Sequence, residues 1–311
     1  MAKSNSKSKA WSALVPGDIV DLVAPASSCS QEELESAMES VKQLGLIPRL
    51  PESIFDDDEP LFSTSDKKRF EYLKRALLAR DSKAIWCLRG GYGSLRILPA
   101  LSKLAKPKTQ KLFIGLSDIT SLHIFLNQKW RWKTIHGPML GTFSQRINTE
   151  QHEIADVVFG RIDEISFLHL EPLNAAAKKK KKITGVVRGG NLLTVQGAQG
   201  TPWNLNAKNS ILFFEEVNER GYRNDRMFSS LIQSGLFKNA KAVVLGDFIG
   251  GNEPDGQNYV NHVIQDFASQ LKIPVLRGIR SGHGDLRRPV PFNTNSVLKT
   301  GLDASLICAV R

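Results

Sequence analysis

One stretch of the chain decides its fold class: Leu112-Phe113-Ile114-Gly115-Leu116-Ser117-Asp118. Its apolar run predicts a buried strand over residues 112–116. Directly after it, Leu122, Phe125 and Leu126 recur at the spacing of one helix face. A buried strand that turns at once into a helix is typical of a doubly wound α/β domain, in which functional sites form beyond the carboxyl ends of the strands.

The sequence before this stretch repeats the same alternation. Residues 19–24 and 84–88 form apolar runs that predict two further strands. Ser30 and Glu33 form a capping box that predicts the start of a helix, and a second helix is expected over 66–78. We therefore predict an N-terminal α/β domain over residues 1–165, with parallel strands joined by crossover helices.

The second half of the chain is less regular. Residues 166–185 contain alanines and the run Lys178–Lys182, a composition that predicts a solvated linker rather than a packed element. Residues 186–311 are expected to form a smaller, mixed, β-rich C-terminal domain. Its expected elements are strands at 211–215, 242–248, near Val275 and at 305–310, with a helix around 223–234.

Composition limits the class of protein. The 311 residues are 41% hydrophobic, which is enough to bury a core, and the three cysteines form no metal or disulfide pattern. The polar, lysine-bearing segment Met1–Ser12 leads into no apolar stretch of signal-peptide or membrane-span length, so we expect a cytoplasmic protein without a membrane partner. The net charge of +11 leaves a non-enzymatic binder of nucleic acid or anionic wall polymer as an alternative, although the lysine run supplies five of these charges.

Ser117 is the first candidate for chemistry. A serine on a tight turn from strand to helix holds its hydroxyl at the edge of the sheet, and the Asp118 amide would face the same space. The match to Gly-x-Ser-x-Gly is incomplete because Ile119 replaces the second glycine. Ser117 could equally be a helix N-cap, with Asp118 as a favourable first-turn acid.

A glycine-rich loop follows the strand predicted at 84–88. In Arg89-Gly90-Gly91-Tyr92-Gly93, the glycines allow backbone amides to converge on an anion. A nucleotide loop is a weaker interpretation, because Arg96 stands where its last glycine belongs and no Gly-Lys-Ser/Thr motif is present.

The general base would be one of six histidines. His123 and His169 lie in apolar segments and are expected to be packing residues, whereas His152 and His262 fall in amphipathic helices. That leaves two histidines in loops, where a ring with a reference pKa of about 6.5 can shuttle protons. They are His136 and His283.

The acid that orients this base would be Glu215 or Glu216, at the end of an apolar strand. Strand alternation sends them to opposite faces, so at most one can reach a given histidine. Both could also be ordinary solvated glutamates.

Together these segments resemble, in order, the LD-carboxypeptidase family of serine peptidases, which includes muropeptide carboxypeptidases and the microcin C self-immunity peptidase. The resemblance runs through nearly the whole chain. The segments that carry it are Gly17–Ser27, Ala84–Gly93, Gly115–Asp118, His136–Pro138, Gly189–Leu192, Gly200–Pro202, Phe214–Val217, Tyr222–Met227 and Gly282–His283.

The resemblance implies a flavodoxin-like first domain and a catalytic triad of Ser117, Glu215 and His283 in a site between the domains. It implies oxyanion or substrate contacts from Asp118 and from Gly90, Gly91 and Tyr92. It also implies a homodimer, and neither a metal nor an organic cofactor. Glu216 stands where the family often has aspartate.

The expected reaction is release of terminal D-alanine from the tetrapeptide stem of a muropeptide. The alternative is a related amide hydrolase that inactivates an aminoacyl-nucleotide of the microcin C type. Trp203 is a candidate purine clamp for that alternative, and also an ordinary interface tryptophan.

Overall fold

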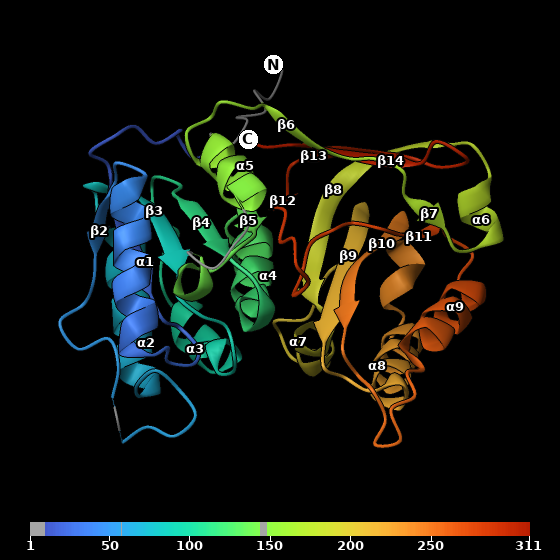
Figure 1. The fold of residues 1–311 in the computed structure, drawn as a ribbon, viewed down its shortest axis with the longest axis horizontal. Helices are drawn as coiled ribbons and strands as arrows, with labels where there is room; N and C mark the ends of the chain where they lie inside the picture. The colour runs from blue at the N-terminus through green and yellow to red at the C-terminus, as the bar shows by residue number, and fades with distance from the viewer. Residues whose placement is uncertain (1–9, 57, 144–147) are drawn as a thin grey trace, which may run out of the picture.

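The computed structural model describes residues 10–56, 58–143 and 148–311. Most of the segment Met1–Ser12 therefore lies outside the described residues. Figure 1 shows two sheet-containing halves side by side, with helix α4 (Thr120–Lys129) between them.

The first half is built on a sheet with the strand order β12-β5-β4-β3-β1-β2. Strands β1 to β5 pair in parallel, and their order 2-1-3-4-5 is that of flavodoxin-like domains, which confirms the predicted fold class. The parallel strands are β1 (Ile19–Val23), β2 (Ile47–Arg49), β3 (Ser82–Cys87), β4 (Leu112–Gly115) and β5 (Thr134–His136). The helical elements are α1 (Gln31–Gln43), α2 (Asp66–Leu78), α3 (Ser94–Leu101), η1 (Ser117–Ile119), α4, η2 (Leu140–Thr142) and α5 (Asn148–Val158).

Local sequence signals set several of these boundaries. Helix α1 begins at the predicted capping box, in which the Glu33 amide donates to Ser30 Oγ and Glu33 Oε2 accepts from the Ser30 amide. Helix α4 is buried around its whole circumference from Thr120 to Asn127, as expected of a helix covered by both halves of the molecule.

The second half is a mixed sheet of eight strands in the order β6-β14-β13-β8-β9-β10-β11-β7. Its central strands β8 to β11 run parallel, and the outer strands run antiparallel. The strands are β6 (Glu164–Phe167), β7 (Glu171–Pro172), β8 (Lys182–Asn191), β9 (Ser210–Val217), β10 (Ala242–Ile249), β11 (Val275–Arg277), β13 (Asn295–Lys299) and β14 (Ser305–Ala309). The helical elements are α6 (Ala175–Lys178), α7 (Leu192–Gly197), α8 (Gly221–Gln233), η3 (Leu236–Asn239) and α9 (Val260–Gln270).

Residues 166–185, expected as an unpacked linker, instead contain the end of β6, all of β7 and α6, and the start of β8. The lysines of the run are solvent-exposed as expected, but Ala177 beside them is fully buried. Asn174 caps α6, and its side-chain amide also donates to three carbonyls, one in the last turn of α9 and two just after that helix. Composition misleads here because strand pairing, the Asn174 hydrogen bonds and a few separated buried side chains fix the segment, without a continuous apolar run. The buried side chains include Leu170, Leu173 and Ala177.

A late strand joins the two halves. β12 (Val290–Phe292) comes from the C-terminal region but pairs antiparallel with β5 in the first sheet. A single buried apolar cluster includes Ile135 of β5, Phe213 of β9 and Phe292 of β12. The segment that leaves β11 must therefore cross from the second sheet to the first. This crossing segment carries His283.

Within the described part of the chain, no helix is both long enough and apolar enough to cross a membrane.

Candidate active site

Ser117 occupies a strained turn at the carboxyl end of β4. Its φ is 64°, in the left-handed region that costs a residue with a Cβ roughly 1–2 kcal/mol. The following carboxylate fixes the turn, because Asp118 Oδ2 accepts the Ser94 amide at 2.7 Å. Burial raises the pKa of Asp118. The turn therefore presents Ser117 at the start of a helix, with the Asp118 N–H in the first turn, where no intrahelical acceptor is available.

The glycine loop packs directly on this turn. A Cβ atom at Gly90 would lie 2.7 Å from Ser117 Cβ and 3.1 Å from its Oγ, so only glycine fits without displacement. Gly91 has φ +92°, and a Cβ there would overlap the Ser27 side chain. The Tyr92 amide donates to Ser27 Oγ at 3.1 Å, and its side chain is 54% exposed.

Arg69, a buried arginine of α2, fixes the end of the glycine loop through a hydrogen bond to the Gly93 carbonyl. Arg69 is 1% exposed, and its guanidinium donates to the carbonyls of Thr64, Pro25 and Gly93. It also pairs with Asp66 at the start of the same helix. Sequence reasoning missed this residue, because one arginine on an amphipathic helix gives no sign that it turns inward.

Glu215 and His283 meet at the carboxyl end of β9. His283 Nδ1 lies 2.7 Å from Glu215 Oε2. The Glu215 side chain is fully buried, and its other oxygen has no hydrogen-bond partner among the described residues. A buried carboxylate bonded to one ring nitrogen fixes the orientation of the imidazole and leaves Nε2 for chemistry.

Glu216 points the other way, as strand alternation predicts. Its carboxylate accepts from Asn191 Nδ2 and the amides of Leu193 and Val217, at 2.8 to 2.9 Å. Burial and the neighbouring Glu215 raise the pKa of Glu216 to about 7. The histidine partner is thus Glu215, and Glu216 anchors the start of α7.

Close packing around two glycines and Asp247 fixes the loop that carries His283. Gly282 has φ +136°, and a Cβ there would lie 2.9 Å from Glu215 Oε2. The Gly284 amide donates to Asp247 Oδ2 at 3.2 Å. Burial raises the pKa of Asp247 to about 6. Asp247 was not a sequence candidate, and its place in an apolar strand of the form Gly-Asp-Phe was the only available signal.

Contacts between the sheets bring the serine turn toward this pair. Thr120 Oγ1, three residues after Ser117, accepts the Asn191 amide at 2.9 Å, and Asn191 stands opposite Glu215 in the β8–β9 register. On the other side, Gly115 is paired with His136, whose pKa burial lowers, with a further contribution from His283. These contacts place the turn that carries Ser117 on the same side of the interface between the sheets as the hydrogen-bonded pair Glu215 and His283.

The other histidines that were considered as bases or packing residues differ in burial. His136 is fully buried between Phe213 and Phe292, so it does not project into a cleft as a loop base would. His123 is a packing residue as expected, with its ring nitrogens bonded to Gly115 O and Thr134 Oγ1.

The expectation for His169 was wrong, because this residue is exposed with φ 56° in the turn between β6 and β7. Its apolar neighbour Leu168, which suggested a packed segment, is itself 58% exposed. His152 and His262 lie in α5 and α9, as expected.

Three further observations concern metal-ligating, thiol and aromatic side chains among the described residues. No group of three or more His, Cys, Asp and Glu side chains there could hold a metal ion. The three cysteines are buried and unpaired. Trp203 packs its ring against Phe125, with centroids 6.0 Å apart, as an ordinary interface tryptophan does.

Comparison with known proteins decides the family. Residues 20–137 match the LD-carboxypeptidase N-terminal domain, and residues 184–298 match the LD-carboxypeptidase C-terminal domain. The chain belongs to the LD-carboxypeptidase family. As a member of this family it is a hydrolytic peptidase.

Curated relatives of this LD-carboxypeptidase cover nearly its whole length. It is 37% identical over 297 residues to a putative carboxypeptidase of Rickettsia conorii, spanning 94% of this chain and 91% of the relative. It is 30% identical over 294 residues to the murein tetrapeptide carboxypeptidase of Pseudomonas aeruginosa, spanning 90% of this chain and 92% of the relative.

Solved structures share the two-domain fold. The muramoyltetrapeptide carboxypeptidase from Oxalobacter formigenes superposes with a TM-score of 0.81 at 27% identity, covering 94% of this chain and 98% of the other. An MccF-like protein from Bacillus anthracis gives 0.82 at 22% identity, covering 97% and 100%, a likeness that shows the fold alone.

Proposed function

We propose that this LD-carboxypeptidase is a serine enzyme that releases terminal D-alanine from the tetrapeptide stem of muropeptides. The observation that carries the proposal is the buried Glu215–His283 hydrogen bond, held on the segment that crosses toward the strained Ser117 turn. The substrate class is supported by relatives named as murein tetrapeptide and muramoyltetrapeptide carboxypeptidases.

In the proposed mechanism, His283 Nε2 removes the proton from Ser117 Oγ as the oxygen attacks the carbonyl of the L-centre that precedes D-alanine. Collapse of the tetrahedral intermediate breaks the peptide bond, and the histidine returns its proton to the departing amine. Water then attacks the acyl-enzyme with the same base, releasing the tripeptide and restoring Ser117. Glu215 keeps Nδ1 protonated and stabilises the imidazolium in both steps.

The negative charge of the intermediate needs donors close to Ser117. The Asp118 amide in the first helical turn and an amide of the Gly90-Gly91 turn are the proposed donors. Their support is the helix start at Ser117 and the contact of Gly90 with its side chain. Each such donor is worth about 3–4 kcal/mol of barrier in other hydrolases. Tyr92 has its amide bonded to Ser27, so its proposed contribution is the exposed ring at the rim of the site.

The cellular setting is also a proposal. We infer a cytoplasmic enzyme, supported by three buried unpaired cysteines, which suit a reducing compartment. The family resemblance supports a homodimer, and light scattering behind a sizing column measures that state directly.

The test compares Ser117→Ala with Ser102→Ala. Ser102 is the C-cap of α3, and its hydroxyl donates to Pro99 O, so this control removes the same group away from the turn. A defined muropeptide tetrapeptide is incubated with each protein, and tripeptide and D-alanine are measured by mass spectrometry. Ser117→Ala should lose turnover while Ser102→Ala keeps it. Undiminished D-alanine release by folded Ser117→Ala would exclude this nucleophile, and cleavage of an aminoacyl-nucleotide in place of the tetrapeptide would exclude the substrate.

A further inference from the structure

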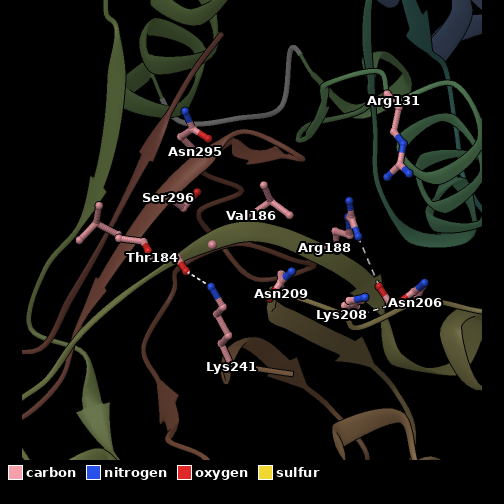
Figure 2. Close-up of a pocket in the computed structure, with 12 residues that line it drawn as sticks. Arg131, Thr184, Val186, Arg188, Asn206, Lys208, Asn209, Lys241, Asn295 and Ser296 are labelled. Atoms are coloured by element: carbon pink, nitrogen blue, oxygen red, sulfur yellow. Dashed lines mark hydrogen bonds between the residues drawn. The ribbon is translucent and has the colours of Figure 1, made fainter. Parts of the chain in front are cut away.

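A cavity of about 760 Å³ opens beside β8 (Figure 2). It lies toward the start of β9, whereas the Glu215–His283 pair lies at the carboxyl end of that strand. Of the described residues that line it, four are cationic and none is acidic. The four are Arg131, Arg188, Lys208 and Lys241. They come from separate parts of the chain: the turn after α4, strand β8, the loop before β9 and the loop before β10.

Arg188 gives the clearest sign that the cavity is built for a ligand. Arg188 is 9% exposed, yet among the described residues its guanidinium bonds only the neutral oxygens of Asn293 and Asn206. Burial, and the charge of Arg131, lower the pKa of Arg188. Figure 2 shows the Arg131 and Arg188 side chains pointing toward each other across the opening. A buried charge without a counter-ion is costly, and an anion between the two guanidinium groups would remove that cost.

The cationic surface continues along the sheet. On one face of β8 lie Thr184, Val186 and Arg188, which are two residues apart. Lys182 precedes Thr184 by two residues and therefore lies on the same face. Lys182 stands directly opposite Lys299 of β13 in the strand register. Like charges in this position destabilise a sheet unless an anion shields them. The lysine run that the catalytic site leaves unused thus ends beside the cavity.

The cavity is separate from the proposed catalytic site. Asn209 and Ser210 mark the start of β9, whereas Glu215 lies five residues further along the strand. At about 3.3 Å per residue, the start of β9 lies roughly 17 Å from Glu215, and Arg188, opposite Leu212 in the register, lies roughly 10 Å from it along the sheet. A ligand in the cavity therefore leaves the Glu215–His283 pair free.

We propose that this cavity binds a small anion carrying more than one phosphate group. The planar guanidinium groups of Arg131 and Arg188 suit the bidentate recognition of phosphate oxygens. Lys208 and Lys241 add positive charges at other parts of the lining. The volume lies within the range of small-molecule sites and is larger than one phosphate needs. The site is independent of the peptidase activity proposed above.

The probe is inorganic pyrophosphate, titrated calorimetrically into the full chain. The test variant is Arg131→Asn with Lys208→Gln, because both side chains are exposed and asparagine tolerates the φ of 61° at residue 131. The matched control is Lys67→Gln with Lys103→Gln, which removes the same charge from exposed positions on α2 and after α3.

The parent and the control should bind one pyrophosphate per chain with the same Kd, and the test variant at least about tenfold more weakly. Release of D-alanine without pyrophosphate should be equal in all three proteins, which reports that the fold is intact. Absence of binding by the parent, equal weakening in test and control, or binding of a DNA oligonucleotide that pyrophosphate does not displace would each overturn the assignment.

Discussion

The replacement Glu215→Gln isolates the charge behind the histidine. Its side chain is fully buried and its Oε2 lies 2.7 Å from His283 Nδ1, so glutamine removes the charge with little change in shape. A hydrogen bond to a charged group contributes about 1.5–3 kcal/mol, and the imidazolium formed in the transition state also loses its counter-ion. We expect the barrier to rise by about 3–5 kcal/mol, which lowers kcat/KM by a factor of roughly 10² to 10⁴.

Glu216→Gln is the matched control, because the same change is made one residue along the strand on the opposite face. Its carboxylate bonds Asn191 and backbone amides rather than the histidine, so kcat/KM should fall by less than about tenfold. D-alanine release is followed by mass spectrometry, with circular dichroism melts to confirm folding. An activity of Glu215→Gln within tenfold of the parent, or equal losses in both variants, would refute the assigned triad.

Three further outcomes follow from the geometry. Gly90→Ala should lower kcat/KM at least tenfold, because its Cβ would lie 2.7 Å from Ser117 Cβ. Gly197→Ala should leave activity unchanged, because a Cβ there would meet no described atom within 4 Å. Equal effects of the two changes in the same assay would contradict the role of the glycine loop. Ser117→Gly should be more stable than Ser117→Ala by about 0.5–1 kcal/mol in urea unfolding, since only glycine relieves the φ of 64°; a lower stability would remove the argument for strain. In the folded state the pKa of Glu216 is raised to about 7, so the folded chain binds this proton more tightly than the unfolded chain does. The stability that protonated Glu216 contributes is therefore complete below about pH 4.5 and is lost as the pH rises through 7. The parent should therefore lose about 3 kcal/mol more than Glu216→Gln between these pH values in urea unfolding, and parallel profiles would show that Glu216 is not the titrating group.

Much of the first domain was predictable from local patterns. The apolar run before Ser117, the capping box at Ser30 and the helical spacing in 66–78 depend on residues close in sequence, and the observed elements agree with them. The opposite orientations of Glu215 and Glu216 also followed from strand alternation alone.

Other features depended on contacts between distant segments. Residues 166–185 have a linker composition but pair with strands over a hundred residues away, and His169 has apolar neighbours but is exposed. Arg69 carries no local signal, because the Pro25 and Gly93 carbonyls that it holds lie on other elements. The contacts that Asn191 and Asp247 make with other elements are likewise not visible in their local sequence.

By itself, the sequence determined the strand-turn-helix at Ser117, the parallel α/β domain around it and the two acidic candidates, because strand and helix periods are set within a few residues. Only the tertiary structure decided that Glu215 rather than Glu216 meets His283, that His136 is sealed in the core, and that β12 returns to the first sheet. Tertiary packing also gathered four cationic side chains around one cavity whose described lining contains no acidic residue. These outcomes depend on how separate segments pack, and the hydrophobic core that fixes this packing draws residues from the whole chain.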